Sequence, residues 1–278
     1  ITIDANPANL PTITIGAISG DNYISRAEST QDVLISGVTE RVEQGRQVTV
    51  VLNGKSYFGT VQLNGSWSVT VPAADATLLP EGPLTAQANV SDVANNPASD
   101  VHQVTVIASL ADQPSLAVGT VAGNDIIDLQ ESNSPLIISG TSQRVPANQT
   151  VTVTLNSKTY TAQVQADGSW QVSVPSADVK NLPQGSNTIG ATVNDAAQNP
   201  ANATHNVSVD TQAPLLVVDV DTSINGVLNL ADALLGLVVH GTCIGDSGLQ
   251  VTVTVAGKPY QATVQNDGTW TLTIPTAD

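Results

Sequence analysis

The sequence has very few of the residues that build disulfides, zinc sites and aromatic binding surfaces. It holds one cysteine, three histidines, no methionine, one phenylalanine, three tryptophans and four tyrosines in 278 residues. A single cysteine, Cys243, excludes a disulfide within the chain, and we expect it to be a small buried strand residue. Histidine and cysteine are too sparse for a zinc cage.

Basic residues and long apolar runs are also scarce. Eight Lys and Arg stand against 24 Asp and Glu, which gives a net charge of −16. This charge argues against nucleic acid and anionic lipid as partners, and no stretch reaches the roughly 20 apolar residues of a membrane span. The acidity has two interpretations, which are solubility or carboxylates held by hard cations. With no signal peptide and no methionine at position 1, we expect a piece of a longer polypeptide.

One stretch occurs three times, as residues 62–72, 165–175 and 265–275. Each copy has Asn-Gly or Asp-Gly, then Ser or Thr, a tryptophan, an alternating run and a proline. Asn-Gly and Asp-Gly supply the left-handed backbone of a tight hairpin turn, and the alternation is typical of a strand that the proline ends. Each copy therefore predicts a turn followed by a strand, with its tryptophan filling a core.

The tryptophans Trp67, Trp170 and Trp270 lie 103 and 100 residues apart, which indicates a tandem array of domains. Ile1–Asp4 resembles Val207–Asp210, so we expect residues 1–10 to be the end of a preceding repeat plus a linker. We place domain 1 at 11–107, a linker at 108–113 and domain 2 at 114–210. Domain 3, at 211–278, lacks the last two strands within this piece. Short linkers that carry proline restrict reorientation and favour a rod.

Seven short strands with polar turns and no helical period predict an all-β fold of immunoglobulin-like sandwiches. The third strand shows the pattern best, because Val48, Val50 and Leu52 alternate with Thr49 and Val51. In domain 1 we expect strands at 12–18, 33–38, 47–52, 56–62, 67–71, 84–90 and 101–107.

Acidic and amide residues gather in two loops of each repeat. The loop between the last two strands, here the last-hairpin loop, should lie at the end where the chain enters. The loop after the first strand, here the first loop, should lie where the chain leaves. Carboxylates two to four residues apart suit Ca²⁺, which takes about 6–8 oxygen ligands. Asx turns use the same residues without metal, and this alternative stays open for each position. The candidate metal ligands are Asp4, Asn6, Asp21, Asn22, Glu28, Asp92, Asp112, Asp125, Asp128, Glu131, Asp195, Asp210, Asp219, Asp221 and Asp232.

Other polar positions favour structural roles. Asp75, Asp178 and Asp278 follow the tryptophan strand, and we expect them to cap a short helical turn. His102 and His205 should open the last strand on a surface edge, with no nucleophile near them in sequence. Paired carboxylates could suggest a glycosidase, but a thin sandwich offers no cleft for a substrate. The sequence therefore predicts no catalytic residues.

Three motifs together resemble the bacterial Ig-like repeats of giant non-fimbrial, type I-secreted adhesins of the SiiE type. They are the Asp/Asn-Gly-Ser/Thr-Trp strand, Leu-Pro-x-Gly at 79–82 and 182–185, and Asp-x-x-x-Asn-Pro at 92–97 and 195–200. The resemblance implies an extracellular stalk, junctions stiffened by Ca²⁺ and attachment to host cells. It places Asp92, Asp195, Asp4 and Asp210 at metal positions. Ile107 departs from the linker aspartate, which puts calcium at that junction in doubt or recruits Asp112.

The leading hypothesis is a non-enzymatic, monomeric segment of a secreted adhesin. Its partners would be the neighbouring repeats and a host receptor or glycan that the sequence does not identify. Low cytosolic calcium would keep the chain unfolded for export, and external calcium would then order it. A carbohydrate-binding module is the first alternative, for which Tyr23, Tyr57, Tyr160 and Tyr260 are the few candidate aromatic residues. An accessory module of a surface glycoside hydrolase is the second.

Overall fold

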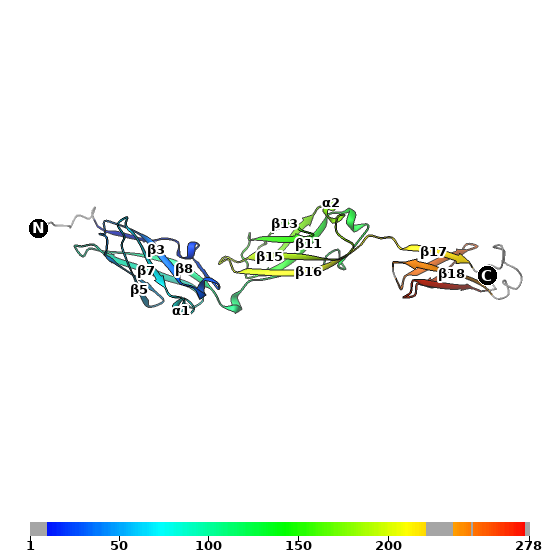
Figure 1. Cartoon of the computed structure of the whole chain (residues 1–278), viewed down its shortest axis with the longest axis horizontal. Coiled ribbons are helices and arrows are strands. Elements are labelled where there is room, and N and C mark those ends of the chain that lie inside the picture. The colour runs from blue at the N-terminus through cyan, green and yellow to red at the C-terminus, as the bar shows by residue number, and fades with distance from the viewer. Residues whose placement is uncertain (1–9, 221–235, 246, 276–278) are drawn as a thin grey trace.

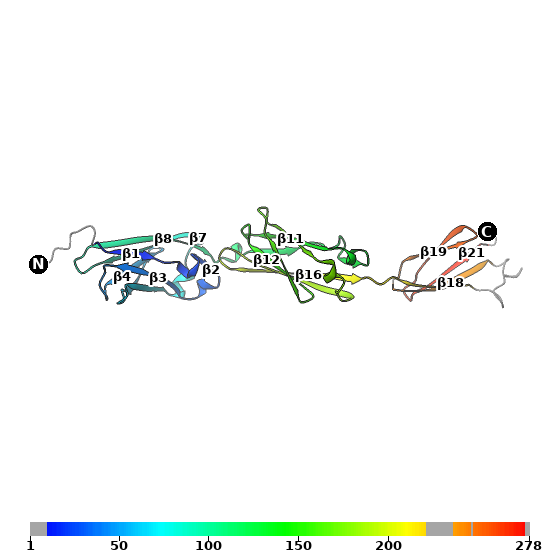
Figure 2. The same cartoon turned by 90° about the horizontal axis from the view of Figure 1, so that it is seen from above.

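The computed structural model describes residues 10–220, 236–245 and 247–275. Figure 1 shows three β-sandwiches strung along the long axis of the molecule, and Figure 2 shows the same line of sandwiches from above. Described residues outside strands form loops, short 3₁₀ turns and two four-residue helices, α1 (Ala73–Ala76) and α2 (Ser176–Val179). The predicted all-β fold of tandem immunoglobulin-like sandwiches is confirmed. Among the described residues, no helix has the length and apolar character needed to cross a membrane.

The first sandwich packs a three-stranded sheet against a five-stranded one. The sheet order is β1-β3-β6 in one layer and β2-β8-β7-β4-β5 in the other. Their bounds are β1 (Thr12–Ile15), β2 (Tyr23–Ser25), β3 (Val33–Glu40), β4 (Gln47–Leu52), β5 (Lys55–Thr60), β6 (Ser66–Val71), β7 (Gly82–Ser91) and β8 (Pro97–Ile107).

The second sandwich repeats this topology 103 residues later. The orders are β14-β11-β9 and β10-β16-β15-β12-β13. Their bounds are β9 (Ser115–Val118), β10 (Ile126–Asp128), β11 (Leu136–Gln143), β12 (Thr150–Leu155), β13 (Lys158–Gln163), β14 (Ser169–Val174), β15 (Gly185–Asn194) and β16 (Pro200–Asp210).

The third unit shows the corresponding early strands. Its sheets have the orders β17-β18-β21 and β19-β20. Their bounds are β17 (Leu215–Val220), β18 (Leu237–Ile244), β19 (Gln250–Val255), β20 (Lys258–Thr263) and β21 (Thr269–Ile274). Cys243 lies in β18 and is buried, as predicted.

The repeated tryptophan fills the core of each unit. Trp67, Trp170 and Trp270 are at most 2% exposed, which confirms the prediction made from the repeated stretch. A glycine on the neighbouring strand makes room for each ring. A Cβ added at Gly140 would lie 2.5 Å from Trp170 Cζ2 and 2.0 Å from the Ala117 carbonyl oxygen. The close packing of ring, strand and glycine therefore fixes how β9, β11 and β14 align.

The first loop contains a strand that the sequence analysis did not predict. After β1 ends at Ile15, short of the expected Ile18, the chain makes a 3₁₀ turn that buries Ile18 completely. It then forms β2, which pairs in parallel with β8 so that Ser25 faces Ile107. In the second sandwich β10 pairs with β16 and Asp128 faces Asp210. Three-residue strands carry no alternation long enough to identify, and they place the first loop beside the outgoing chain.

Candidate functional site: the junctions between sandwiches

The last-hairpin loop of the second sandwich lies directly on the outgoing end of the first. Asn199 Oδ1 accepts a hydrogen bond from the Arg26 amide at 2.9 Å, and Asn199 Nδ2 donates to the Ile107 carbonyl at 2.9 Å. Arg26 follows β2 and Ile107 ends β8. The predicted placement of these loops at opposite ends of a domain is therefore what the structure shows.

A buried carboxylate holds Asn199 in place. Asp195 is 1% exposed and Asn199 is 2% exposed. Asp195 Oδ1 accepts from the amides of Ala197 at 2.8 Å and Asn199 at 2.9 Å, and Oδ2 accepts from Asn199 Nδ2 at 3.0 Å. Hydrogen bonds from inside the loop thus satisfy both carboxylate oxygens, as an Asx-type turn requires.

The linker after Ile107 is fixed from the first sandwich as well. Arg26 Nη1 donates to the Ala108 carbonyl at 3.1 Å, and the Glu81 carboxylate accepts from the amides of Ala108 and Ser109. Backbone groups of Ala108 and Ser109 are thereby paired with side chains of the first sandwich. A linker held in this way has few alternative conformations, which restricts the angle between the two sandwiches.

A pocket of about 400 Å³ lies beside this linker, and its lining includes Glu81, Asp112, Asp195 and Arg144. Three acidic residues therefore share one pocket. Glu81 and Asp195 already accept hydrogen bonds from backbone amides, and Arg144 brings a positive charge to the wall. A divalent cation would have to compete with those amides and with a cation of the protein, so this donor set does not fit calcium well.

The Asp92 loop of the first sandwich is built like the Asp195 loop. Asp92 is 2% exposed and accepts from the Asn96 amide at 2.8 Å and from Asn96 Nδ2 at 2.7 Å. Burial opposes its ionisation, but the hydrogen bonds from Asn96 and Ala94 and the charge of Arg46 lower the pKa of Asp92 overall. The carboxylate stays charged because the loop solvates it.

At the start of the first loop, the Asp and Asn side chains accept hydrogen bonds from nearby backbone amides. Asp21 Oδ1 accepts from the Tyr23 amide at 2.9 Å, and Asn22 Oδ1 accepts from the Ile18 amide at 3.0 Å. The equivalent of Asn22 is Asp125, which accepts from the Val121 amide at 2.8 Å and lies 2.7 Å from His205 Nε2. The Val121 amide and then His205 lower the pKa of Asp125. The Asp21 contact is an Asx turn, and the Asn22 and Asp125 oxygens are likewise satisfied by groups of their own sandwich.

Both histidines lie inside the last strand of their sandwich. His102 lies within β8 and His205 within β16, so the prediction that they open this strand is wrong. The strand begins earlier, because Pro97 and Pro200 already pair with β7 and β15. His102 Nε2 lies 2.7 Å from Asn22 Oδ1, which repeats the contact between His205 and Asp125. Each histidine therefore ties the first loop to the last strand.

The end of the first loop differs between the two sandwiches. In the first, Glu28 Oε2 accepts from the Ser25 amide at 2.9 Å and the Ser25 hydroxyl at 2.7 Å. In the second, Glu131 and Asp128 each accept from the other's amide, at 3.1 and 2.7 Å. Asp210 faces Asp128 across the strand pair, and both line a pocket together with residues 211–213. Carboxylate chemistry is thus concentrated at the outgoing end of the second sandwich.

Other predicted ligands fall elsewhere. Asp219 lies inside β17 rather than in a loop, because the first strand of the third unit extends to Val220, and its Oδ2 is 3.8 Å from His240 Nε2. Asp4, Asn6, Asp221 and Asp232 lie outside the described residues. Within the described ranges, no three His, Cys, Asp or Glu side chains come close enough to form a metal site.

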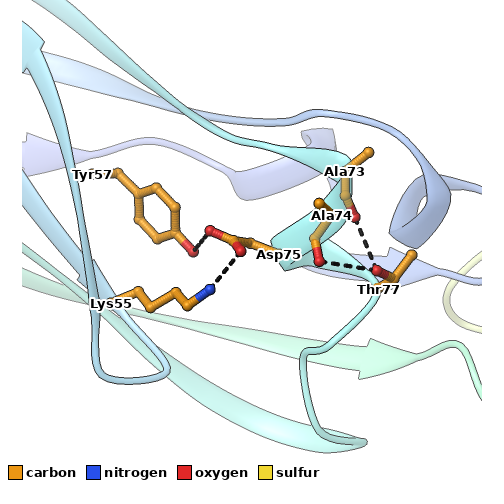
Figure 3. Close-up of polar contacts among 6 residues, drawn as sticks. All are labelled: Lys55, Tyr57, Ala73, Ala74, Asp75 and Thr77. Atoms are coloured by element: carbon orange, nitrogen blue, oxygen red, sulfur yellow. Dashed lines mark hydrogen bonds and ion pairs between the residues drawn. The ribbon is translucent and has the colours of Figure 1, made fainter.

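A lysine, a tyrosine and an aspartate interact in each of the first two sandwiches, and Figure 3 shows the set in the first. Asp75 accepts from Lys55 Nζ at 2.5 Å and from the Tyr57 hydroxyl at 3.1 Å. Lys55 lowers the pKa of Asp75, while burial and then Asp75 raise the pKa of Tyr57 to about 12. The predicted helix cap is wrong here, because Asp75 lies inside α1 and its carboxylate turns to β5.

The second sandwich repeats this interaction. Asp178 pairs with Lys158 and accepts from the Tyr160 hydroxyl at 2.9 Å. Burial and then Asp178 raise the pKa of Tyr160 to about 12. The prediction of a cap fails again, because Asp178 lies within α2 and faces β13. The recurrent tyrosines therefore tie a short helix to the sheet, which gives two of the aromatic residues proposed for sugar binding a structural role.

Sequence reasoning missed Asn199, Arg26 and Glu81 as junction residues. The signal for Asn199 was present, because Asn-Pro closes the same motif at 96–97 and 199–200. Arg26 and Glu81 gave no signal, since their partners are backbone groups of another element. Only the fold brings them to the linker.

Comparison with known proteins agrees with the fold. Residues 119–211 match the model of a family described as bacterial Ig-like domain. A search of curated proteins found no match.

Three solved structures illustrate the similarity. One is a Ca²⁺-stabilized adhesin of an Antarctic bacterium that binds ice, with 29% identity over 95% of this chain and 66% of that chain and a TM-score of 0.45. Another is a 1.5-MDa bacterial ice-binding adhesin, with 28% identity over 96% and 87% and a TM-score of 0.43. An immunoglobulin-like domain of the M. primoryensis ice-binding adhesin has 32% identity over 34% and 95% and a TM-score of 0.28.

This chain spans just under two thirds of the first of these structures. At these TM-scores the likenesses carry no argument about the junctions. The family match concerns the second sandwich, whose strand order the first sandwich repeats. The second sandwich thus matches the bacterial Ig-like domain family, and the first shares its motifs and topology.

Proposed function

We propose that the chain is a non-enzymatic segment of a secreted, surface-associated bacterial adhesin, in which sandwiches stack end to end as a stalk. The observation that carries this proposal is the seating of the Asn199 loop on the outgoing end of the first sandwich. Such a contact transmits orientation from one domain to the next. The bacterial Ig-like match of residues 119–211 supports the same assignment.

Calcium would act at the outgoing end of the second sandwich. Asp128 and Asp210 line one pocket there, and one carboxylate oxygen of each accepts no hydrogen bond from another described residue. Oxygen-rich, flexible donor sets suit Ca²⁺, which would neutralise repulsion between these acids. The bound ion would supply positive charge that favours one arrangement of the outgoing linker.

The stalk would present a binding surface to a host cell-surface receptor or glycan, carried by this segment or by domains next to it. Binding of the soluble chain to host cells tests this role. The matched control is the Gly140→Ala variant in low urea, in which the second sandwich is unfolded. Saturable binding by the folded chain supports attachment by this segment. Turnover of a glycan by the chain would contradict the non-enzymatic assignment.

Small-angle scattering of residues 1–278 during a calcium titration tests the stalk itself. We expect the maximum dimension to rise to a plateau and the distribution of shapes to narrow as calcium binds. Asp128→Asn combined with Asp210→Asn should abolish that response, whereas Asp167→Asn in an exposed hairpin turn should not. Dimensions that are the same in calcium and in EDTA would overturn the calcium part of the proposal.

A further inference from the structure

The parallel pair of β2 and β8 ends at the outgoing end of the first sandwich. Ser25 of β2 pairs in parallel with Ile107 of β8, and the ladder stops there. The next backbone groups along its edge are the Arg26 N–H and the Ile107 C=O. If the ladder continued, these two groups would bond to each other, so a group placed between them must offer one acceptor and one donor.

The Asn199 side chain supplies that pair of groups. Its Oδ1 accepts from Arg26 N–H and its Nδ2 donates to the Ile107 carbonyl, both at 2.9 Å. A carboxamide has one acceptor and one donor group, as a peptide bond does, so it bridges the ends of the two strands. A carboxylate in its place could accept from Arg26 but could not donate to Ile107.

The second sandwich itself holds the side-chain amide of Asn199 in its orientation. Asp195 fixes the Asn199 amide and side chain through both carboxylate oxygens, and the Asp195 amide donates to the Asn199 carbonyl at 3.0 Å. The loop is closed by Pro200, which starts β16. A side chain held this rigidly loses little entropy when it binds the neighbouring domain.

We propose that the Asp-x-x-x-Asn-Pro loop is a metal-independent docking element, whose asparagine completes the open end of the parallel strand pair in the preceding sandwich. The partner it fits is therefore the outgoing end of another Ig-like repeat. The first sandwich builds the same loop around Asn96, with the Asn96 amide 2.8 Å from Asp92 Oδ1. The first and second sandwiches form one rigid body without calcium.

Amide hydrogen exchange in the whole chain tests this contact directly, because the Arg26 amide donates to Asn199 Oδ1. In EDTA we expect Arg26 to exchange at least tenfold faster in Asn199→Ala than in the unaltered chain. The same increase is expected in Asn199→Asp, because a carboxylate there would be repelled by Asp195 and by the Ile107 carbonyl and the loop would no longer dock. Asn202→Asp, which adds the same charge at an exposed position of β16, should leave Arg26 protected. Amides within β4 report that the first sandwich stays folded in every variant.

Nuclear spin relaxation in the same samples tests rigidity. The first two sandwiches should tumble as one body in EDTA, with one rotational correlation time. In each Asn199 variant the two sandwiches should have different rotational correlation times. Equal Arg26 exchange in Asn199→Ala and the unaltered chain would overturn the proposal, as would protection of Arg26 that needs added calcium. If no calcium binds anywhere but Arg26 stays protected, the calcium proposal fails and this one stands.

Discussion

The first and second sandwiches are nearly the same inside and differ where the chain leaves them. Both bury a tryptophan against a glycine, and both tie β5 or β13 to a short helix through Lys, Tyr and Asp. At the outgoing end, however, the positions held by Ser25, Arg26, Glu81 and Ile107 in the first become Asp128, Leu129, Gln184 and Asp210 in the second.

The two outgoing ends therefore suit two different ways of joining one domain to the next. The first end offers an arginine and a glutamate that bind the backbone of the linker, and it receives Asn199. The second end replaces the arginine with leucine and adds two aspartates that face each other. Interior substitutions should therefore act alike in both sandwiches, while substitutions at the outgoing ends should not.

The largest effect should come from the glycine that faces each tryptophan. Gly140→Ala places a Cβ 2.5 Å from Trp170 Cζ2, and Gly37→Ala places one 2.7 Å from Trp67 Cζ2. Overpacking of this kind costs about 1–3 kcal/mol or more, and we expect similar losses in both sandwiches. Urea unfolding followed by NMR signals of each sandwich measures the free energy of unfolding.

Gly119→Ala is the matched control for the glycine substitutions. An added Cβ there meets its nearest atom, the Ser139 carbonyl oxygen, at 3.4 Å. It should change stability by less than about 0.5 kcal/mol. Equal losses from Gly119→Ala and Gly140→Ala would contradict the packing account.

Calcium binding should separate the two outgoing ends. Among the described strand pairs, two aspartates face each other only at the outgoing end of the second sandwich. Asp210→Asn removes one of these carboxylates, and we expect at least a tenfold loss of calcium affinity. Titration calorimetry of the whole chain measures it. The reverse exchange, Ser25→Asp with Ile107→Asp, should add a binding site to the first sandwich. An unchanged affinity in Asp210→Asn would remove calcium from this end.

Tyr57 and Tyr160 should act alike in the two sandwiches. Tyr57→Phe and Tyr160→Phe each remove one hydrogen bond to an aspartate, at a cost of about 0.5–1.5 kcal/mol. The raised pKa of about 12 favours the protonated phenol in the folded state. That contribution is complete below the unfolded pKa of about 10 and is lost as the pH rises toward 12.

Unfolding free energies measured between pH 9 and 12 check this dependence. The unaltered chain should lose stability through that range, and the phenylalanine variants should lose less. A steeper alkaline loss in the variants than in the unaltered chain would contradict the assignment.

Arg26→Leu should have the smallest effect. It gives the first sandwich the residue found at position 129 and removes the exposed bond from Arg26 Nη1 to Ala108. The Arg26 amide still donates to Asn199, so stability should fall by less than about 1 kcal/mol. Hydrogen exchange of the linker amides measures the change. A complete loss of coupling between sandwiches would show that the arginine side chain, and not Asn199, carries the contact.

The sequence contained enough information for the fold because its signals were local and repeated. The Asn-Gly or Asp-Gly turns, the tryptophan strands and the alternation in β4 and β12 each predict their element without outside contacts. The three-residue strands β2 and β10 escaped prediction because they exist through pairing with β8 and β16.

The candidate site was predictable in place but not in detail. The acidic loops were correctly expected at domain ends, yet sequence cannot show that Asp195 bonds its own loop or that Asp178 faces Lys158 and Tyr160. An aspartate in a turn has the same local sequence whether backbone amides or a cation satisfy it. Whether a metal joins them stays a prediction.

Spin-label distances across both junctions test the central claim most directly. Thr70, Ser173 and Thr273 are equivalent exposed positions, each three residues after a buried tryptophan, and can carry the labels in a Cys243→Ser background. The account predicts that the distance distribution between 70 and 173 is narrow in EDTA and unchanged by calcium, while that between 173 and 273 narrows when calcium is added. If both distributions respond to calcium alike, the two outgoing ends do not differ as proposed.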